Sequence, residues 1–469
     1  MKMIPSKKLD KKSIEDIIAL TPLQQGMLFH YLKEPGPDLY FEQLSIGISG
    51  PVDINCFKQA WNIVVDTNEM LRAVFQWERL KHPIQAILKT HHLSLRYDDL
   101  TSTGETRTLK DVKARDRNEK FDLGEVPFRV RLCKINENRF EVIISSHHIL
   151  YDGWSNGIIL KEFFKAYHDL CNKKNPVKPV KTTFKEFVKW MRSQGTDRYK
   201  QERFWRNYLN GFDTPTRLAV KKIRAQEGVY PGNSLIRFKE DIKNRLEDFV
   251  KNGGITLASF LYGVWGILVQ RYNNSGDVVF GTTVAGRSAK IKGIEDIVGL
   301  FINTVPLRVQ TQPGSNEKIG EFLERIHRSL RMRTVYEHTS LPDIKEYSEI
   351  NNADELFDTI VVIENYPLSS RLIPGNSKLS IDSYTMVEMT HYDLTVNITV
   401  SDGIVVNAAY NKYLFEEETM VRLLHHFERV VGNILDNPGA RVTGIEVLSK
   451  AEKNQILYEF NCTDVEYPK

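Results

Sequence analysis

The chain has 469 residues, of which 41% are hydrophobic, so it can bury a large core and form roughly two to four compact units. Its 64 basic and 60 acidic residues leave a net charge of only +4, which gives no electrostatic case for binding nucleic acid or an anionic membrane. Four cysteines lie far apart without CxxC spacing, which argues against a disulfide scaffold or a zinc site: Cys56, Cys133, Cys171 and Cys462. With no signal-peptide core and no apolar run near the ~20 residues that cross a bilayer, we expect a cytoplasmic protein.

The first part of the chain is expected to combine helices with a sheet. Residues 1–14 are polar and lysine-rich, which predicts a mobile or docking segment. Residues 57–65 repeat apolar side chains with a helical period, and a strand-like run follows over 73–77. A helix packed on a sheet is therefore the expected arrangement.

A hairpin is predicted next. Two strand-like runs, 128–135 and 139–146, flank the turn-forming residues Asn136-Glu137-Asn138. The second strand leads directly into His147 and His148. Because successive residues of a strand point to opposite faces, the two imidazoles are expected to have different surroundings.

The residues after these histidines bring a carboxylate and a glycine close to them. Asp152 and Gly153 lie in a short connection, and Ser155 is the expected N-cap of a helix over 156–170. An imidazole on a rigid strand end, a nearby carboxylate and a backbone N–H beside glycine are groups that an acyl-transfer site uses.

Histidine pairs also have an ordinary structural explanation. The chain contains His91-His92 and His425-His426 as well, neither of which is followed by an Asp-Gly turn. The pair at 425–426 lies in a helical pattern, where a histidine of the core or surface is the usual finding. On spacing alone, the structural interpretation of 147–155 remains the more common one.

The second part of the chain repeats the plan of the first. Residues 171–183, CNKKNPVKPVKTT, form a Lys/Pro-rich connector and mark the expected boundary between two lobes. Beyond it, residues 257–269 predict a helix buried on every side, and residues 277–284 predict a strand that ends before Gly286-Arg287. We expect two similar α/β lobes.

The stretch at 147–153 resembles the HHxxxDG signature of condensation domains from nonribosomal peptide synthetases. Five other segments resemble motifs of that family in the family's order: 21–30 (TPLQQGMLFH), 69–75 (EMLRAVF), 184–190 (FKEFVKW), 298–308 (VGLFINTVPLR) and 391–395 (HYDLT). The chain departs from the family at Asn68, where a histidine is usual, and at Phe184 and Glu186, which replace tyrosine and aspartate. The resemblance covers roughly residues 15–450.

The resemblance implies an α/β fold made of two chloramphenicol-acetyltransferase-like lobes in a V-shaped pseudo-dimer with a tunnel between them. The expected domains are an N-terminal polar segment over 1–14, an N-terminal lobe over 15–178 that carries HHxxxDG, and a C-terminal lobe over 179–449 with tunnel-closing loops. Residues 450–469 resemble the linker toward an adenylation domain. The chain is expected to be the beginning of a longer synthetase.

The implied reaction is formation of an amide bond between two carrier-bound substrates. The amine of an acceptor aminoacyl thioester attacks the carbonyl of a donor acyl or peptidyl thioester. The 4′-phosphopantetheine arms of carrier proteins bring both substrates, so no cofactor or metal is expected to bind directly. The expected partners are a donor peptidyl carrier protein on another polypeptide, and an acceptor carrier protein and an adenylation domain downstream.

The resemblance assigns catalytic roles to two residues. His148 would accept the proton of the acceptor amine as a neutral imidazole, or aim the amine at the carbonyl by a hydrogen bond. Gly153 would leave room beside His148 and direct its N–H at the oxyanion, in a turn that needs positive φ.

Five further residues are expected to support the site. His147 would bond a backbone group behind the strand, and Asp152 would form a buried ion pair with Arg72. Trp154 is expected to be a packing anchor, and Asn303 is expected on a loop that closes the tunnel.

Related functions remain as alternatives. An epimerisation domain would carry an EGHGR-like loop and a heterocyclisation domain would replace the histidines with aspartates, and this chain has neither feature. A stand-alone acyltransferase with a small soluble acceptor and an inactive recruitment platform also stay open. The opening motif, with residues 26–30 at a helix start, resembles that of domains that accept a D-configured donor. The resemblance implies a D-peptidyl or D-aminoacyl donor first, an acyl or polyketide donor second and an L-donor third.

Overall fold

The structure is a computed structural model that describes residues 9–33, 39–101, 108–194, 197–220, 222, 231–312, 314–351, 354–364, 372–375, 377–400 and 403–462. The first eight residues of the predicted polar segment and the last seven of the predicted linker lie outside this range.

The chain divides into two compact units that are both discontinuous in sequence. The first unit comprises Met1–Tyr199, Val284–Asn303 and Tyr366–His391, and the second comprises the remaining residues. The division differs from the expected boundary at residue 178, because two later segments return to the first unit. A boundary read from composition marks a connector, but it does not show which sheet a later strand joins.

The first unit contains a five-stranded sheet of order β12-β2-β7-β6-β5. Its strands are β12 (Ser380–Glu388), β2 (Phe41–Ser49), β7 (Arg139–His147), β6 (Phe128–Asn136) and β5 (Arg96–Asp99). The predicted hairpin is confirmed, since β6 and β7 pair antiparallel around a short turn.

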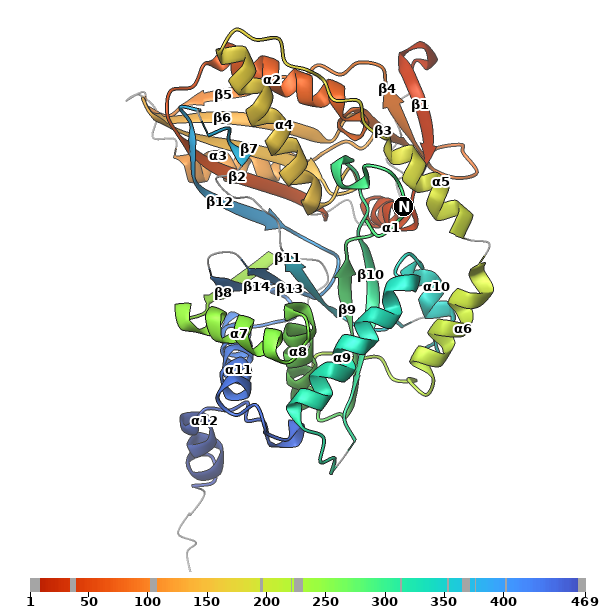
Figure 1. The fold of residues 1–469 in the computed structure, drawn as a ribbon, viewed down its shortest axis with the longest axis vertical. Coiled ribbons are helices and arrows are strands. Elements are labelled where there is room, and N and C mark those ends of the chain that lie inside the picture. Colours follow the sequence, from red (N-terminus) through yellow and green to blue (C-terminus); the bar gives the residue numbers. More distant parts are fainter. Residues whose placement is uncertain are drawn as a thin grey trace, which may run out of the picture. The chain divides into compact units, whose positions relative to one another are not determined.

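Helices cover both faces of this sheet, as Figure 1 shows. They are α2 (Ile54–Thr67), α3 (Leu109–Asn118) and α4 (Gly153–Cys171). On one face, Trp61 of α2 packs against Phe163 of α4 with ring centroids 4.6 Å apart and lies near Phe128 of the sheet. On the other face, Val112 of α3 packs with Cys133 and Ile143 of β6 and β7.

The first unit also contains a small second sheet with helical elements near it. A three-stranded sheet has the order β1-β4-β3. Its members and the neighbouring helices are β1 (Ile14–Ala19), β4 (Ile84–Leu88), β3 (Ala73–Gln76), α1 (Pro22–Lys33), the 3₁₀ turn η2 (Glu69–Arg72) and α5 (Phe184–Gln194). The predicted helix over 57–65 and the predicted strand over 73–77 are both present as α2 and β3.

The second unit contains a six-stranded mixed sheet of order β10-β9-β11-β13-β14-β8. The strands are β10 (Asn303–Gln310), β9 (Asp277–Val284), β11 (Thr359–Glu364), β13 (Leu394–Val400), β14 (Ile404–Asn411) and β8 (Pro231–Arg237). The helices are α6 (Arg198–Leu209), α7 (Glu240–Asn252), α8 (Leu257–Asn273), α9 (Ile319–Arg333), α10 (Leu341–Glu346), α11 (Glu417–Asp436) and the short α12 (Lys450–Asn454).

Helix α8 is the centre of the second unit's core. Every residue from Ser259 to Gln270 is buried, so the prediction of a helix that is apolar and buried on all sides is confirmed. Two glycines let neighbours approach it closely: a Cβ at Gly263 would meet Leu323 at 2.5 Å, and one at Gly266 would meet Val309 at 2.8 Å. The helix therefore packs against α9 and β10 at short range.

One strand changes units. β11 and β13 pair in parallel in the six-stranded sheet, yet β12, which lies between them in sequence, pairs antiparallel with β2 of the first unit. Figure 1 shows β12 as a long blue strand beside the red β2. The first sheet is therefore completed by a segment from late in the chain.

No single helix among the described residues has the length and apolar composition needed to cross a membrane. The pair α7 and α8 reaches that composition only together, across a bend of 105°.

Candidate functional site

The end of β7 holds both histidines of the HHxxxDG motif. His147 is the last residue of β7, and His148 begins the turn that follows it. The backbone N–H of His148 donates to the carbonyl of Tyr40 at 2.7 Å, which extends the pairing of β7 with the segment before β2 by one residue. Only 6% of His148 is exposed, so the strand holds this imidazole in a fixed, nearly dry position.

The ring of His148 has a defined orientation. Its Nδ1 lies 2.9 Å from the carbonyl oxygen of Tyr151 and 2.8 Å from Oε1 of Glu42 on β2. Both oxygens accept hydrogen bonds, so Nδ1 carries the proton and donates it. The second nitrogen, Nε2, is then the atom available to a substrate.

A second carboxylate lies on the other side of this ring. Oε1 of Glu388, the last residue of β12, is 3.8 Å from Nε2 of His148. Glu388 and Glu42 are register partners across β12 and β2, so the two carboxylates stand directly opposite each other with His148 beside them.

These carboxylates change the acidity of the imidazole. Burial by itself would lower the pKa of His148, but Glu42 and Glu388 outweigh it and raise the pKa to about 10. Burial raises the pKa of Glu388 to about 7, against the opposing effect of the His148 charge. At neutral pH these surroundings favour an imidazolium at His148, and they do not support the expectation of a neutral imidazole base.

His147 has different surroundings. Only 1% of it is exposed, and its Nδ1 accepts the backbone N–H of Ile149 at 3.2 Å. Its ring packs edge-on to Tyr31 and near Tyr40. Burial lowers the pKa of His147 to about 3, so this ring is neutral and contacts the turn that carries His148.

Asp152 is fully buried and is the N-cap of α4. Its Oδ1 accepts the hydroxyl of Ser155 at 2.9 Å and the Nη2 of Arg287 at 3.1 Å, and its Oδ2 accepts the N–H of Phe301 at 3.0 Å. The prediction that Ser155 is the N-cap is therefore wrong, because α4 begins at Gly153 and Ser155 is its third residue.

The predicted ion pair between Asp152 and Arg72 is also wrong. Arg72 pairs with Glu15 of β1 and donates to the carbonyls of Leu88 and Lys89, so it joins strands of the small sheet. The partner of Asp152 is Arg287, whose side chain is 8% exposed. The sequence motif that contains Arg72 is thus structural at a different place in the first unit.

Arg287 is held by backbone carbonyls and a ring as well as by Asp152. It donates to the carbonyls of Ile294 and Ile297 at 2.7 and 3.0 Å, and its guanidinium lies 4.0 Å from the ring centroid of Phe301. The preceding Gly286 has φ +64°, and a Cβ there would lie 1.8 Å from the carbonyl oxygen of Phe301. Only glycine fits this close approach.

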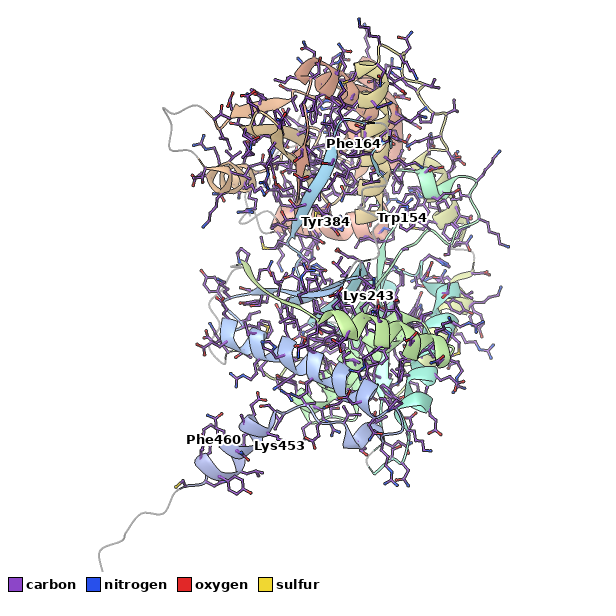
Figure 2. All side chains as sticks on the ribbon, turned by 60° about the vertical axis from the view of Figure 1, so that its left-hand side comes forward. Trp154, Phe164, Lys243, Tyr384, Lys453 and Phe460 are labelled. Atoms are coloured by element: carbon purple, nitrogen blue, oxygen red, sulfur yellow. The ribbon has the colours of Figure 1, made fainter. Side chains whose placement is uncertain are left out.

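The other predicted residues lie around this network. Gly153 is the first residue of α4 and has no positive φ, so the expected left-handed turn is wrong. Trp154 is 40% exposed and donates its indole N–H to the carbonyl of Glu295 at 3.2 Å. Figure 2 labels Trp154 at the start of α4 and Tyr384 on β12. Asn303 is the half-buried first residue of β10.

Glu42, His148 and Glu388 are also the kind of side chains that hold a metal ion, and their ligand atoms lie within 4.8 Å of one another. A cation held there would meet the ring of His148 only at Nε2, because Nδ1 carries the proton that is donated to the carbonyl of Tyr151.

Sequence reasoning missed Glu42, Arg287 and Glu388. A glutamate in the otherwise buried strand β2 was a detectable signal for Glu42, and the position of Arg287 after a strand and a glycine was another. Nothing in the exposed, mixed sequence of β12 singled out Glu388.

The comparisons with known proteins agree with one another. A family model described as Condensation domain matches residues 14–457. Surfactin synthase subunit 3 of Bacillus subtilis (strain 168) is 33% identical over 460 residues, which cover 96% of this chain and 35% of that protein. Gramicidin S synthase 2 of Brevibacillus brevis is 32% identical over 467 residues, 98% of this chain and 10% of that protein. The chain thus spans about a third or less of the length of these relatives.

Solved structures share the fold. The first condensation domain of the calcium-dependent antibiotic synthetase, in complex with a substrate analogue, matches with a TM-score of 0.77 at 18% identity and covers 93% of this chain and 100% of that one. A four-domain nonribosomal peptide synthetase bound to AMP and glycine matches with a TM-score of 0.79 at 17% identity over 96% of this chain and 35% of that one. The expected fold of two chloramphenicol-acetyltransferase-like α/β lobes is confirmed, while the V-shaped arrangement and the tunnel stay predictions.

Proposed function

Because the chain belongs to the condensation domain family of nonribosomal peptide synthetases, we propose that it joins a donor acyl or peptidyl thioester to the amine of an acceptor aminoacyl thioester. Domains of this family are acyltransferases that form amide bonds, so the reaction class follows from the family. The observation that supports an active domain is the buried His148, fixed by Tyr151 and Glu42 with its Nε2 toward Glu388.

The reaction depends more on the positioning of its two substrates than on covalent catalysis by the protein. A thioester is already activated, so holding amine and carbonyl in attack geometry supplies much of the rate, up to about 7–11 kcal/mol for well-oriented reactions. His148 contacts the acceptor amine and aims it at the donor carbonyl. Gly153 is at the N-terminus of α4, where backbone N–H groups lack helical partners, and it stabilises the oxyanion.

The remaining site residues hold this arrangement. His147 supports the turn from behind, and Asp152 with Arg287 ties that turn to the segment 297–301. Trp154 anchors the start of α4 through Glu295, and Asn303 follows the same segment at the start of β10.

The partners are proposed from the relatives, which are far longer than this chain. Carrier proteins deliver donor and acceptor on 4′-phosphopantetheine arms, and an adenylation domain follows the linker that begins at residue 450. The four cysteines are free thiols, which supports a reducing, cytoplasmic location. No cofactor is proposed to bind the domain itself.

The test of this function measures amide product from loaded carriers by mass spectrometry. His148→Ala should keep the fold and lose at least about 10²-fold in rate, the loss that a misplacement of the reacting groups by ~1 Å causes. His425→Ala is the matched control, because His425 is exposed on α11. Activity of His148→Ala within about threefold of the wild type would contradict the assignment.

The donor is proposed in the order D-peptidyl or D-aminoacyl, then acyl or polyketide, then L-configured. This order depends on the opening motif, in which residues 26–30 lie in the middle of α1 and not at a helix start as expected. Equal amounts of L-aminoacyl, D-aminoacyl and fatty-acyl carriers should compete for one acceptor, and we expect the D-aminoacyl product to dominate. A clear preference for the L-donor would reverse the order.

A further inference from the structure

Two carboxylates share one histidine at the end of β7. Glu42 and Glu388 are directly opposite each other on neighbouring strands, where like charges destabilise a sheet. The imidazolium of His148 supplies one positive charge between them. With both carboxylates ionised, the cluster keeps an excess of one negative charge in a nearly dry place, which is the environment that attracts a cationic group.

The two carboxylates are not equivalent. Glu42 lies 2.8 Å from Nδ1 of His148 and its side chain is 3% exposed, so it is committed to orienting the ring. Glu388 is 3.8 Å from Nε2, beyond hydrogen-bond distance, and its side chain is 18% exposed. Among the described residues no side chain donates a hydrogen bond to Glu388, so its carboxylate is accessible and unused beside the catalytic nitrogen.

We propose that Glu388 binds the ammonium group of the acceptor and accepts its proton, so that the amine attacks the donor carbonyl uncharged. The inference rests on the proposed function and assigns the proton acceptor for it. His148 then stays protonated, and it orients the reacting groups while Glu388 removes the proton.

Two protons leave the acceptor nitrogen during the reaction. The ammonium gives one proton to the Glu388 carboxylate, and the freed nitrogen lone pair forms the C–N bond. The C–S bond of the donor thioester breaks, its electrons leave on sulfur, and the second proton of the attacking nitrogen goes to that thiolate. Glu388 returns to its ionised form by releasing its proton to solvent, and no oxidant, reductant or metal takes part.

The acidities fit this transfer. Burial raises the pKa of Glu388 to about 7, although the positive His148 opposes the shift and Glu42 adds to it. An ordinary α-ammonium has a pKa of about 8, so the proton passes between groups of similar strength. Proton transfer is most effective when the catalytic pKa lies near the working pH. Within this cluster, Glu388 and not His148 changes its charge near neutrality.

The experiment compares two acceptors with the same donor carrier. One is the N-acetylcysteamine thioester of L-leucine, whose nitrogen is an ammonium at neutral pH. The other is its α-aminooxy analogue, whose nitrogen is uncharged there. Glu388→Gln should lose about 10²-fold with the leucyl acceptor and less than about fivefold with the aminooxy acceptor, because the second has no proton to give before attack.

The pH profile gives a second readout. With the leucyl acceptor, the rate of Glu388→Gln should be about 10²-fold below that of the wild type at pH 6.5. At pH 9, where solvent deprotonates the amine, it should be only about tenfold below. Asp382→Asn is the matched control, since Asp382 is an exposed carboxylate on the same strand that bonds Ser49, and it should stay within twofold of the wild type.

Two outcomes overturn the inference. Equal losses with both acceptors at every pH would show that Glu388 only supports the sheet, and activity within threefold on the leucyl acceptor would show that it is not the proton acceptor. A wild type that makes no product from either acceptor would overturn the proposed function and this inference with it.

Discussion

Asp152 connects the motif to residues far along the chain. It is buried, and it binds Arg287 and Phe301, which are 135 and 149 residues away in sequence. An ionised carboxylate in such a place needs compensation by charge and hydrogen bonds. Ser155, Arg287 and the N–H of Phe301 provide it, so Asp152 fixes the position of the motif and does no chemistry itself.

Removing either member of this ion pair should destabilise the first unit. Asp152→Ala leaves Arg287 buried without its counter-ion, which typically costs about 3–5 kcal/mol. At this size 1 kcal/mol shifts Tm by about 2–4 °C, so we expect a fall of at least about 6 °C in thermal melting for Asp152→Ala and for Arg287→Ala. The double variant should melt close to the single variants, because the pair acts as a unit.

Arg72→Ala serves as the comparison, because its partner Glu15 is 52% exposed. When Arg72→Ala is added to the Asp152, Arg287 and double variants, the differences in Tm among these three should stay the same. If the Tm losses of Asp152→Ala and Arg287→Ala added up in the double variant, the result would contradict the ion pair.

The part of the site that is local in sequence could be predicted, and the long-range part could not. His147, His148, Asp152 and Gly153 lie within seven residues, so a motif identifies them together. The partner of Asp152 was predicted wrongly, because a carboxylate does not reveal which of 64 basic residues reaches it after folding. The position of Glu388 beside His148 depends on the pairing of β12 with β2, which no local sequence pattern encodes.

At the scale of elements, the short helix α12 is held by a small polar cluster. His426 on α11 donates or accepts at both nitrogens, with Nδ1 2.8 Å from the hydroxyl of Tyr272 and Nε2 2.9 Å from Glu452 on α12. Ser449 caps α12 in a capping box with Glu452. Exposed apolar side chains follow, among them Phe460, which Figure 2 labels beside Lys453.

Glu452→Gln should loosen α12 without unfolding the unit. Burial alone would raise the pKa of Glu452, but its bonds with Ser449 and His426 outweigh this and lower the pKa to about 2. A lowered carboxyl pKa stabilises the fold above the unfolded value of 4.5, and that stabilisation is lost as the pH falls toward 2.

The measurement is hydrogen exchange of residues 450–459 at neutral pH, which should become faster in Glu452→Gln while Tm changes by less than about 2 °C. Glu418→Gln is the control, because Glu418 is exposed in the first turn of α11 and lies outside this cluster. Unchanged exchange in Glu452→Gln would show that the cluster does not hold the helix.

Elements with a strong local pattern were predicted well. The hairpin of β6 and β7 and the buried helix α8 follow from alternation and from apolar continuity. β12 has little apolar patterning, and most of its residues are exposed or partly exposed. Its identity as a strand comes from pairing with β2, which tertiary structure decides.

At the scale of the whole molecule, neither compact unit is a continuous piece of chain. Residues 9–199 expressed alone would lack β12, which leaves the buried strand β2 as an open sheet edge. They would also lack Arg287 and Phe301, the partners of Asp152. We expect this fragment to aggregate on size-exclusion chromatography, because an unpaired apolar edge recruits other strands.

Coexpression of residues 200–469 should restore a soluble complex with a cooperative melt, since it supplies β12 and the segment 284–303. A monomeric, cooperatively melting fragment 9–199 would contradict the view that the late segments complete the first unit.

The crossing of β12 also sets an order of events during translation. Glu388 leaves the ribosome about 190 residues after Tyr199, which at ~5–20 residues per second is a delay of roughly 10–40 s. Throughout that interval the nascent first sheet has a bare edge at β2, and the histidine at its end has only one of its two carboxylates. Codon choice between these positions therefore governs how long β2 of a nascent chain can pair with strands of other chains. Slow codons there should reduce the yield of native enzyme.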